Sequence, residues 1–278
     1  MINLIIINIT KTPINWSSKK WALNECIQKA KGEIILQTDA DCRHTHTWIS
    51  EMIKPFKNQN TGFVCGPSYI GTNKNFWDQI LQLESISQES FTYANSKREL
   101  YISCTARNIG FRKLAFKEVK GYDDIAHIKS GDDDLLLHKV VTQTNWGIEY
   151  IANKKALVES DSPKSIKSFY LQRLRYASKG LLYYTLKTPL EVKVILPFLF
   201  IANIACAISI INFINTQSWI WVPAILLKSI SDIILINKYM YEIKMDFKLL
   251  YFMILTIIHP FYVIIIGGIA PFTKVQWK

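Results

Sequence analysis

The sequence predicts an α/β domain followed by a helical membrane domain, and two observations support this fold class. Before residue 190, short apolar runs that suit strands alternate with stretches of helical period, which is typical of an α/β sheet. From residue 190 onward only 11 charged residues occur, and Ile, Leu and Phe dominate. We therefore expect a partial α/β domain at 1–165, an amphipathic interface segment at 166–189 and a membrane domain at 190–278.

The predicted elements of the α/β domain follow in the order strand, helix, strand, helix, strand. Their ranges are Leu4–Ile9, Lys20–Ala30, Glu33–Gln37, Thr47–Phe56 and Gly62–Cys65. Ligands of such sheets bind at the carboxyl ends of the strands. The residues that follow Gln37 are therefore placed for chemistry.

The membrane domain has three apolar segments, at about 194–214, 219–237 and 249–270. The first holds 21 residues without a charge, which is enough to cross a hydrocarbon core of about 30 Å. The second carries Lys228 and Asp232, and a charge at mid-bilayer costs about 2.5–3.5 kcal/mol unless it is paired. We expect these two to pair, or else the segment to be re-entrant, so the domain has two to three spans.

Charge predicts the orientation. Residues 154–193 hold nine Lys and Arg against three acids, and the positive-inside rule assigns this side to the cytosol. The five cysteines show no regular spacing, which fits free thiols in a reducing compartment. We expect a multi-pass protein of the inner or plasma membrane whose α/β domain faces the cytosol. Three crossings would place the tail with Lys274 and Lys278 outside, against the rule.

An acidic triplet, Asp39-Ala40-Asp41, follows the strand at Glu33–Gln37. Two carboxylates at a strand end can hold a hard divalent cation, which in turn neutralises a diphosphate. Alone, such a triplet is more often a solvated turn. Cys42, His44 and His46 also raise the possibility of zinc, but the neighbouring carboxylates favour a harder ion.

Several more motifs occur in a fixed order along the chain. They are Trp16–Asn24 (WSSKKWALN), Ser103–Arg112 (SCTARNIGFR), Lys120–Asp123 (KGYD), Ser130–Leu135 (SGDDDL) and Gln172–Tyr176 (QRLRY). With the acidic triplet, this set resembles the family 2 glycosyltransferases with a GT-A fold. It is most similar to the membrane-bound branch that includes cellulose, chitin and hyaluronan synthases and ceramide glucosyltransferase.

The resemblance implies an inverting transfer of a sugar from a nucleotide-diphosphate sugar, expected to be a UDP-sugar, to a hydroxyl of a lipid or polysaccharide. It also implies a cofactor, Mg²⁺ or Mn²⁺, and roles for individual residues. Asp39 and Asp41 match the metal and diphosphate ligands, and Lys20 and Asn24 match a GKxxALN-like stretch that lines the nucleotide. The QxxRW element is matched by Gln172, Arg173 and Arg175, which would bind the donor, and by Tyr176, which replaces Trp and would pack on the acceptor.

The triplet Asp132-Asp133-Asp134 matches the element that supplies the general base. We assign the base to Asp133, with Asp132 or Asp134 as the alternative. Three consecutive acids repel one another and raise at least one pKa, a condition common at proton-accepting sites. The competing interpretation is a helix cap for Leu135–Leu137, and both can hold.

Compared with the family, the sequence begins at what corresponds to the third strand. We therefore expect an amino-terminally truncated domain, and possibly a protein partner that supplies the missing strands. The alternative function is an inactive or split-gene glycosyltransferase fragment that acts as a membrane scaffold or partner subunit. The basic stretch Lys164–Lys187 precedes a membrane span, which favours anionic headgroups over nucleic acid as its partner.

Overall fold

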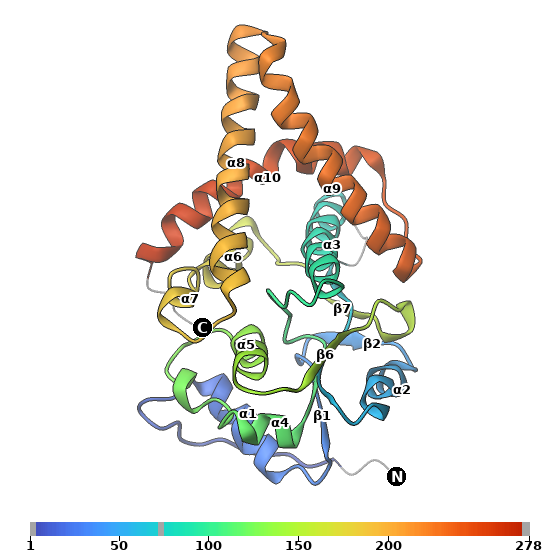
Figure 1. Ribbon diagram of the computed structural model, residues 1–278, viewed down its shortest axis with the longest axis vertical. Helices are drawn as coiled ribbons and strands as arrows, with labels where there is room; N and C mark the ends of the chain where they lie inside the picture. Colours follow the sequence, from blue (N-terminus) through green and yellow to red (C-terminus); the bar gives the residue numbers. More distant parts are fainter. Residues whose placement is uncertain (1–3, 72–74, 274–278) are drawn as a thin grey trace.

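The computed structural model describes residues 4–71 and 75–273 (Figure 1). Its α/β domain is built on two small mixed sheets. The larger has the strand order β1-β5-β3-β6 and the smaller the order β2-β7-β4. The strands are β1 (Ile34–Gln37), β2 (Cys42–His44), β3 (Thr61–Cys65), β4 (Ser68–Ile70), β5 (Ile109–Arg112), β6 (Gly147–Tyr150) and β7 (Val158–Ser160).

Pairing is antiparallel for β1 with β5 and for β5 with β3, and parallel for β3 with β6. In the smaller sheet β2 is antiparallel and β4 parallel to β7. The helices of the domain are α1 (Ser18–Lys29), α2 (Trp48–Ile53), α3 (Phe76–Ser96), α4 (Lys113–Glu118), α5 (Asp134–Gln143), α6 (Ile166–Ala177) and α7 (Leu182–Thr185). Short 3₁₀ turns lie at Lys54–Lys57, Asp123–Ile125 and Lys154–Ala156.

Four of the five elements predicted for residues 1–65 are confirmed to within a few residues. The helix predicted at Thr47–Phe56 is divided into α2 and the 3₁₀ turn Lys54–Lys57, whose Pro55 has no amide hydrogen for a continuing helix. The strand predicted at Leu4–Ile9 is wrong, because residues 4–9 form no strand and Leu4 and Ile6 are each 83% exposed. An apolar run becomes a strand only where its backbone finds a ladder partner.

The main core lies between the larger sheet and the helices that cover it. Phe63 of β3 stacks on Phe111 of β5 with ring centroids 6.0 Å apart, and Leu136 of α5 is fully buried against them. The same core includes Val192, at the start of the first membrane helix. The α/β domain and the first membrane helix are thus joined by continuous packing.

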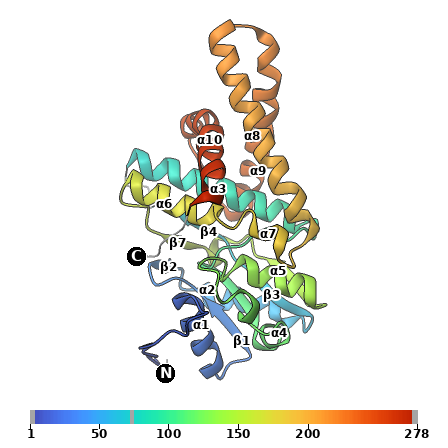
Figure 2. The ribbon, with the colours of Figure 1, turned by 90° about the vertical axis from the view of Figure 1, so that its left-hand side faces the viewer.

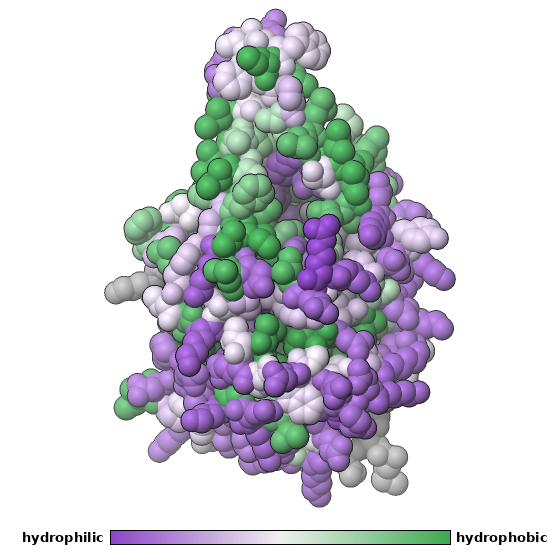
Figure 3. All heavy atoms as spheres, viewed as in Figure 1, coloured by the Kyte–Doolittle hydropathy of each residue, from purple (hydrophilic) through white to green (hydrophobic). Residues whose placement is uncertain are grey.

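Three helices follow the α/β domain: α8 (Leu190–Thr216), α9 (Val222–Ile243) and α10 (Leu249–Ile269), with 3₁₀ turns at Trp219–Trp221 and Ala270–Phe272. All three are long and apolar enough to cross a membrane. Helices α8 and α9 form a hairpin that projects from the rest of the molecule, whereas α10 runs across its base (Figures 1 and 2). Apolar side chains gather on this hairpin and polar ones on the α/β domain (Figure 3).

The two charges within the second apolar segment pair with each other. Lys228 Nζ donates to Asp232 at 2.6 Å, one turn apart on α9. This confirms the expected pair and removes the reason to single out α9 as the segment that fails to cross.

Candidate active site

The carboxyl end of β1 carries the acidic triplet. Asp39 is half-buried, and its Oδ1 accepts a hydrogen bond from Lys19 Nζ at 3.0 Å. Asp41 is exposed and accepts from the thiol of the neighbouring Cys42 at 3.8 Å. The pair therefore lies at the strand end that the sequence predicts, with Asp39 directed inward and Asp41 open to solvent.

Lys19 joins this triplet to the second acidic motif. It lies in the first turn of α1, and its ammonium is also 2.9 Å from Asp132 Oδ2. Gln37, at the end of β1, donates to the same Asp132 oxygen at 3.1 Å. Burial opposes the charge on Lys19, but the carboxylates of Asp132 and Asp39 hold its pKa above the ordinary value. Two motifs that are far apart in the sequence thus share one cationic centre.

Sequence reasoning selected the adjacent lysine, Lys20. The structure buries Lys20 on the other side of α1, where its ammonium donates to three backbone carbonyls at 2.8–2.9 Å. These belong to Ile125, Ile128 and Ser130, in the loop that leads to Asp132. Burial lowers the pKa of Lys20 to about 8. Asn24 is half-buried four residues further on, so it shares the face of Lys20 rather than that of Lys19.

A glycine sets the backbone before the triplet Asp132–Asp134. Gly131 has φ of +82°, and a Cβ there would lie 2.6 Å from Leu135 Cγ. A residue with a side chain would therefore be strained and would displace the start of α5. This turn places Asp133 at the N-cap of α5.

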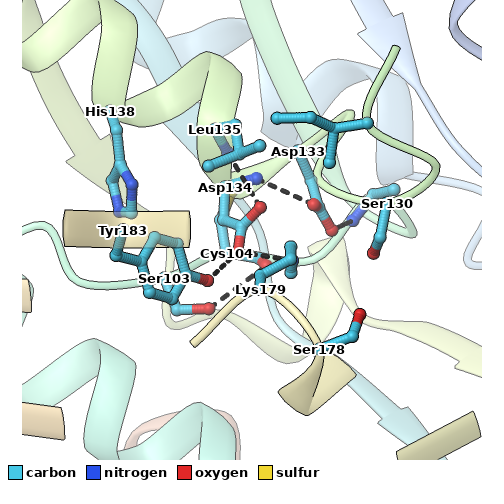
Figure 4. A network of polar contacts seen from close by, with 12 residues as sticks. Ser103, Cys104, Ser130, Asp133, Asp134, Leu135, His138, Ser178, Lys179 and Tyr183 are labelled. Atoms are coloured by element: carbon cyan, nitrogen blue, oxygen red, sulfur yellow. Dashed lines mark hydrogen bonds and ion pairs between the residues drawn. The ribbon is translucent and has the colours of Figure 1, made fainter. Parts of the chain in front are cut away.

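The three acids have different surroundings, of which Figure 4 shows those of Asp133 and Asp134. Asp133 is half-buried, with Oδ2 accepting from the amide of Ala106 at 2.8 Å and Oδ1 from that of Asp134 at 2.8 Å. Asp132 and Asp134 are only 5% and 3% exposed. Asp133 is therefore the member of the triplet that is most open to solvent, while it also caps the helix.

Electrostatics separates the same residues further. Burial, together with the adjacent charge of Asp134, raises the pKa of Asp133 to about 7. Burial also opposes ionisation of Asp134, but the Lys179 ammonium holds the pKa of that carboxyl below its usual range. Neighbouring carboxyls with pKa values pushed apart are characteristic of acid–base sites.

Lys179 and Tyr183 belong to the site although sequence reasoning did not select them. Both donate to Asp134 Oδ2 at 2.6 Å, from the segment between α6 and α7 and from α7 itself (Figure 4). In the sequence Lys179 is one of nine basic residues within 154–193, so charge alone could not identify it. Lys19 could have been found from the sequence, because it lies in the same motif as Lys20 and differs from it only in the face of α1 that it occupies.

The QRLRY motif lies on α6. Arg173 is buried, forms an ion pair with Glu84 of α3, and stacks between the rings of Phe169 and Tyr176 at 5.0 and 5.4 Å. Its ion pair among the described residues is thus directed at α3 and not at Asp39 or Asp132. The guanidinium of Arg175 lies 5.3 Å from the ring of Tyr176, which is 39% exposed. Gln172 is half-buried, and its Oε1 has no hydrogen-bond partner within the described part of the chain.

The carboxylate oxygens at the strand end are hard ligands, the type that Mg²⁺ and Mn²⁺ prefer. The Lys19 ammonium acts as a stand-in ion, because carboxylate oxygens of Asp39 and Asp132 converge on it. Of the side chains considered for zinc, His44 has another partner, since its Nε2 is 2.7 Å from the Thr38 hydroxyl. In residues 4–71 and 75–273 no group of three His, Cys, Asp or Glu side chains is arranged around one point.

One family model matches the chain, that of Glycosyl transferase family 2, over residues 3–120. The match includes α1, β1 and the acidic triplet of β1, and it ends before Asp132 and α6. No curated protein matches the sequence. The matched region, the mixed α/β sheets and the apolar carboxy-terminal helices agree with one another: the chain carries a family 2 glycosyltransferase region of the GT-A type, followed by helices long and apolar enough to cross a membrane.

Proposed function

We propose that the protein is a membrane-bound inverting glycosyltransferase. It moves a sugar from a nucleotide-diphosphate sugar, of the UDP class, to a hydroxyl of a lipid or polysaccharide acceptor. The observation that carries this proposal is the position of Lys19 between Asp39 and Asp132. It places the end of β1, where a diphosphate would bind, beside the triplet that contains Asp133.

Asp133 acts as the general base in this scheme. Its carboxylate accepts the proton of the acceptor hydroxyl while that oxygen forms a bond to the anomeric carbon and the bond from this carbon to the diphosphate oxygen breaks. A pKa near 7 suits this role, because a base is most effective when its pKa lies close to the working pH. The amides of Ala106 and Asp134 fix its orientation.

The leaving diphosphate needs positive charge on the opposite side of the sugar from the base. Lys19 supplies a fixed ammonium there. Asp39 and Asp41 would hold Mg²⁺ or Mn²⁺, which neutralises charge on the leaving group when it is bound. Attack on one face and departure from the other give inversion at the anomeric carbon.

The remaining predicted site residues receive different roles. Lys20 acts on the nucleotide region indirectly, because its ammonium holds the backbone of the loop before Asp132. Asn24 lies on the same face of α1 as Lys20. Arg173 joins α6 to α3 through Glu84. Of the QRLRY motif, Arg175 and Tyr176 are the members we assign to substrate, with Tyr176 offering its exposed ring to the acceptor.

The placement in the cell is part of the proposal. The excess of basic residues in 154–193 and five free cysteines support a cytosolic α/β domain in an inner or plasma membrane. The alternative, an inactive scaffold or partner subunit, draws support from β1, whose outer edge has no ladder partner in the described residues.

Replacement of Asp133 by Asn tests the function. The variant keeps the shape of the side chain and removes proton acceptance, so transfer should fall by about 10²–10⁴-fold while UDP binding is retained. Asp132→Asn should instead weaken UDP binding, because it releases Lys19 and Gln37. Unchanged transfer by Asp133→Asn would assign the base to another residue, whereas no transfer by the unmodified chain with any nucleotide sugar would favour the scaffold.

A further inference from the structure

Helix α10 contacts the α/β domain along its whole length. At its first turn, the ring of Tyr251 lies edge-on to Phe76 of α3, with centroids 5.6 Å apart. In its middle, the hydroxyl of Tyr262 donates to Glu84 of α3 at 2.5 Å. At its end, Ile266 and Ala270 are buried against Leu174 of α6. Both ends of α10 are therefore fixed to helices of the same folded domain.

The hairpin α8–α9 contacts the α/β domain at its base. There Val192 of α8 lies in the main core, and Ile236, Tyr239, Met240 and Ile243 of α9 are buried against α3. At its tip Phe213 packs on Trp219 with ring centroids 5.9 Å apart, while Ile214 and Ile220 are exposed. Helices of 27 and 22 residues are about 40 and 33 Å long, so each exceeds the hydrocarbon thickness of about 30 Å. The hairpin can thus cross a bilayer and return.

The two faces of α10 have different chemistry. The face toward α3, α6 and α8 buries Phe252, Leu255 and Ile266 together with the polar groups of Tyr262 and His259, whose Nδ1 lies 3.3 Å from Asn203 Oδ1. The opposite face is apolar and exposed, with Met253, Ile257 and Ile265 each more than half exposed. The outer face can therefore contact lipid chains, while the polar groups of α10 are paired on protein.

From these contacts we propose that α10 does not cross the membrane. It lies on the α/β side with its outer face in the bilayer, and α8 and α9 are the two crossings. A spanning helix carries its ends to opposite membrane surfaces, and α3 and α6, which hold both ends of α10, belong to one polar domain on one side (Figure 2). This inference concerns the topology and does not depend on the proposed reaction.

The charge distribution agrees with two crossings. The sequence after α10 contains Lys274 and Lys278, which an odd number of crossings would place opposite the basic segment 154–193. With two crossings all these residues lie on the same side, as the positive-inside rule requires.

Cysteine labelling in sealed vesicles of both orientations tests the topology of the full chain. Lys248→Cys and Thr273→Cys flank α10, Asn215→Cys marks the hairpin tip, and the exposed Cys26 of α1 reports the α/β side in every variant. After reaction with a membrane-impermeant maleimide, labelled peptides are identified by mass spectrometry. We expect positions 248 and 273 to react from the side of Cys26, and position 215 from the other side.

Three results would overturn the proposal. They are reaction of position 273 from the side of position 215, reaction of position 273 from neither side, and reaction of all positions from one side. A nitroxide on Ile257→Cys then tests the lipid contact in the same membranes. Its relaxation should respond more to dissolved oxygen than to a water-soluble nickel chelate, with Lys248→Cys as the control that shows the reverse; a stronger response to nickel at position 257 contradicts burial in lipid.

Discussion

Lys179 and Asp134, 45 positions apart in the sequence, form a buried ion pair with 2.6 Å between the ammonium and the carboxylate oxygen. Asp134 adjoins the proposed base, and Lys179 lies two residues after the end of α6, the helix of the QRLRY motif. The membrane-proximal segment is thus attached directly to the acidic triplet.

The first prediction concerns this pair. Lys179→Met should lower the free energy of unfolding by about 3–5 kcal/mol, because it leaves the Asp134 carboxylate buried without its counterion. Lys179→Met combined with Asp134→Leu should recover most of the loss. Thermal unfolding in detergent measures both. Equal stability of Lys179→Met and the unmodified protein would show that the pair contributes little.

The second prediction is a pH dependence. Because a base must be ionised and the pKa of Asp133 is about 7, kcat/KM should rise with pH up to about 7 and then level off. For stability the sign is opposite: a folded pKa above the unfolded value of about 3.9 means that the folded state binds more protons, so this residue's contribution falls as pH rises from about 4 to 7. The residual kcat/KM of Asp133→Asn should not fall as the pH is lowered below about 7. If the fall persists in this variant, another group is responsible for the pH dependence.

The third prediction concerns the acidic triplet of β1. Asp39→Ala and Asp41→Ala should each abolish the increase in UDP affinity that Mn²⁺ produces, since one carboxylate holds the cation poorly. Titration calorimetry with and without Mn²⁺ measures this. Asp161→Ala, which removes an exposed carboxylate paired with Arg43, is the matched control and should keep the full metal effect. If Mn²⁺ increased UDP affinity equally in all three variants, the triplet would be a surface turn that does not bind the metal.

The fourth prediction separates two adjacent lysines. Lys19→Met should weaken UDP binding and lower Tm less than Lys20→Met does, because its ammonium contacts two side-chain carboxylates of the site and Gln37 still donates to the buried Asp132. Lys20→Met should lower Tm, because three buried carbonyls lose their donor at about 1–3 kcal/mol each. The reverse pattern would restore the assignment made from sequence alone.

The sequence predicted the features that depend on local pattern. The position of Asp39 at a strand end and the helix that begins near Lys20 both follow from apolar period and are present. Features that depend on partners were not accessible in this way. Leu4–Ile9 has the composition of a strand but pairs with no other strand that the structure describes. Helix α10 has the composition of a membrane span but packs against α3 and α6 at its two ends.

The site illustrates the same limit at the level of single side chains. A shift of one position on a helix turns a side chain by about 100°, so the motif with two lysines could not show whether Lys19 or Lys20 faces Asp39. The partner of Arg173 was equally hidden, since Glu84 lies on α3, outside every motif found in the sequence. The assignments of Asp133, Asp39 and Asp41 stay predictions until the experiments above are done.

Helix α6 is held between α10 and the acidic triplet, and this affects how the activity of the protein should be measured. One side of this helix is held by Ile266 and Ala270 of α10, and the turn that follows it ends in the Lys179–Asp134 contact. With α10 in contact with lipid, as proposed, we expect lateral pressure on this helix to reach the carboxyl next to Asp133 through α6. We expect turnover to change with acyl-chain length and with transfer from bilayer to micelle. The measured activity should therefore depend on the lipid or detergent in which the protein is assayed.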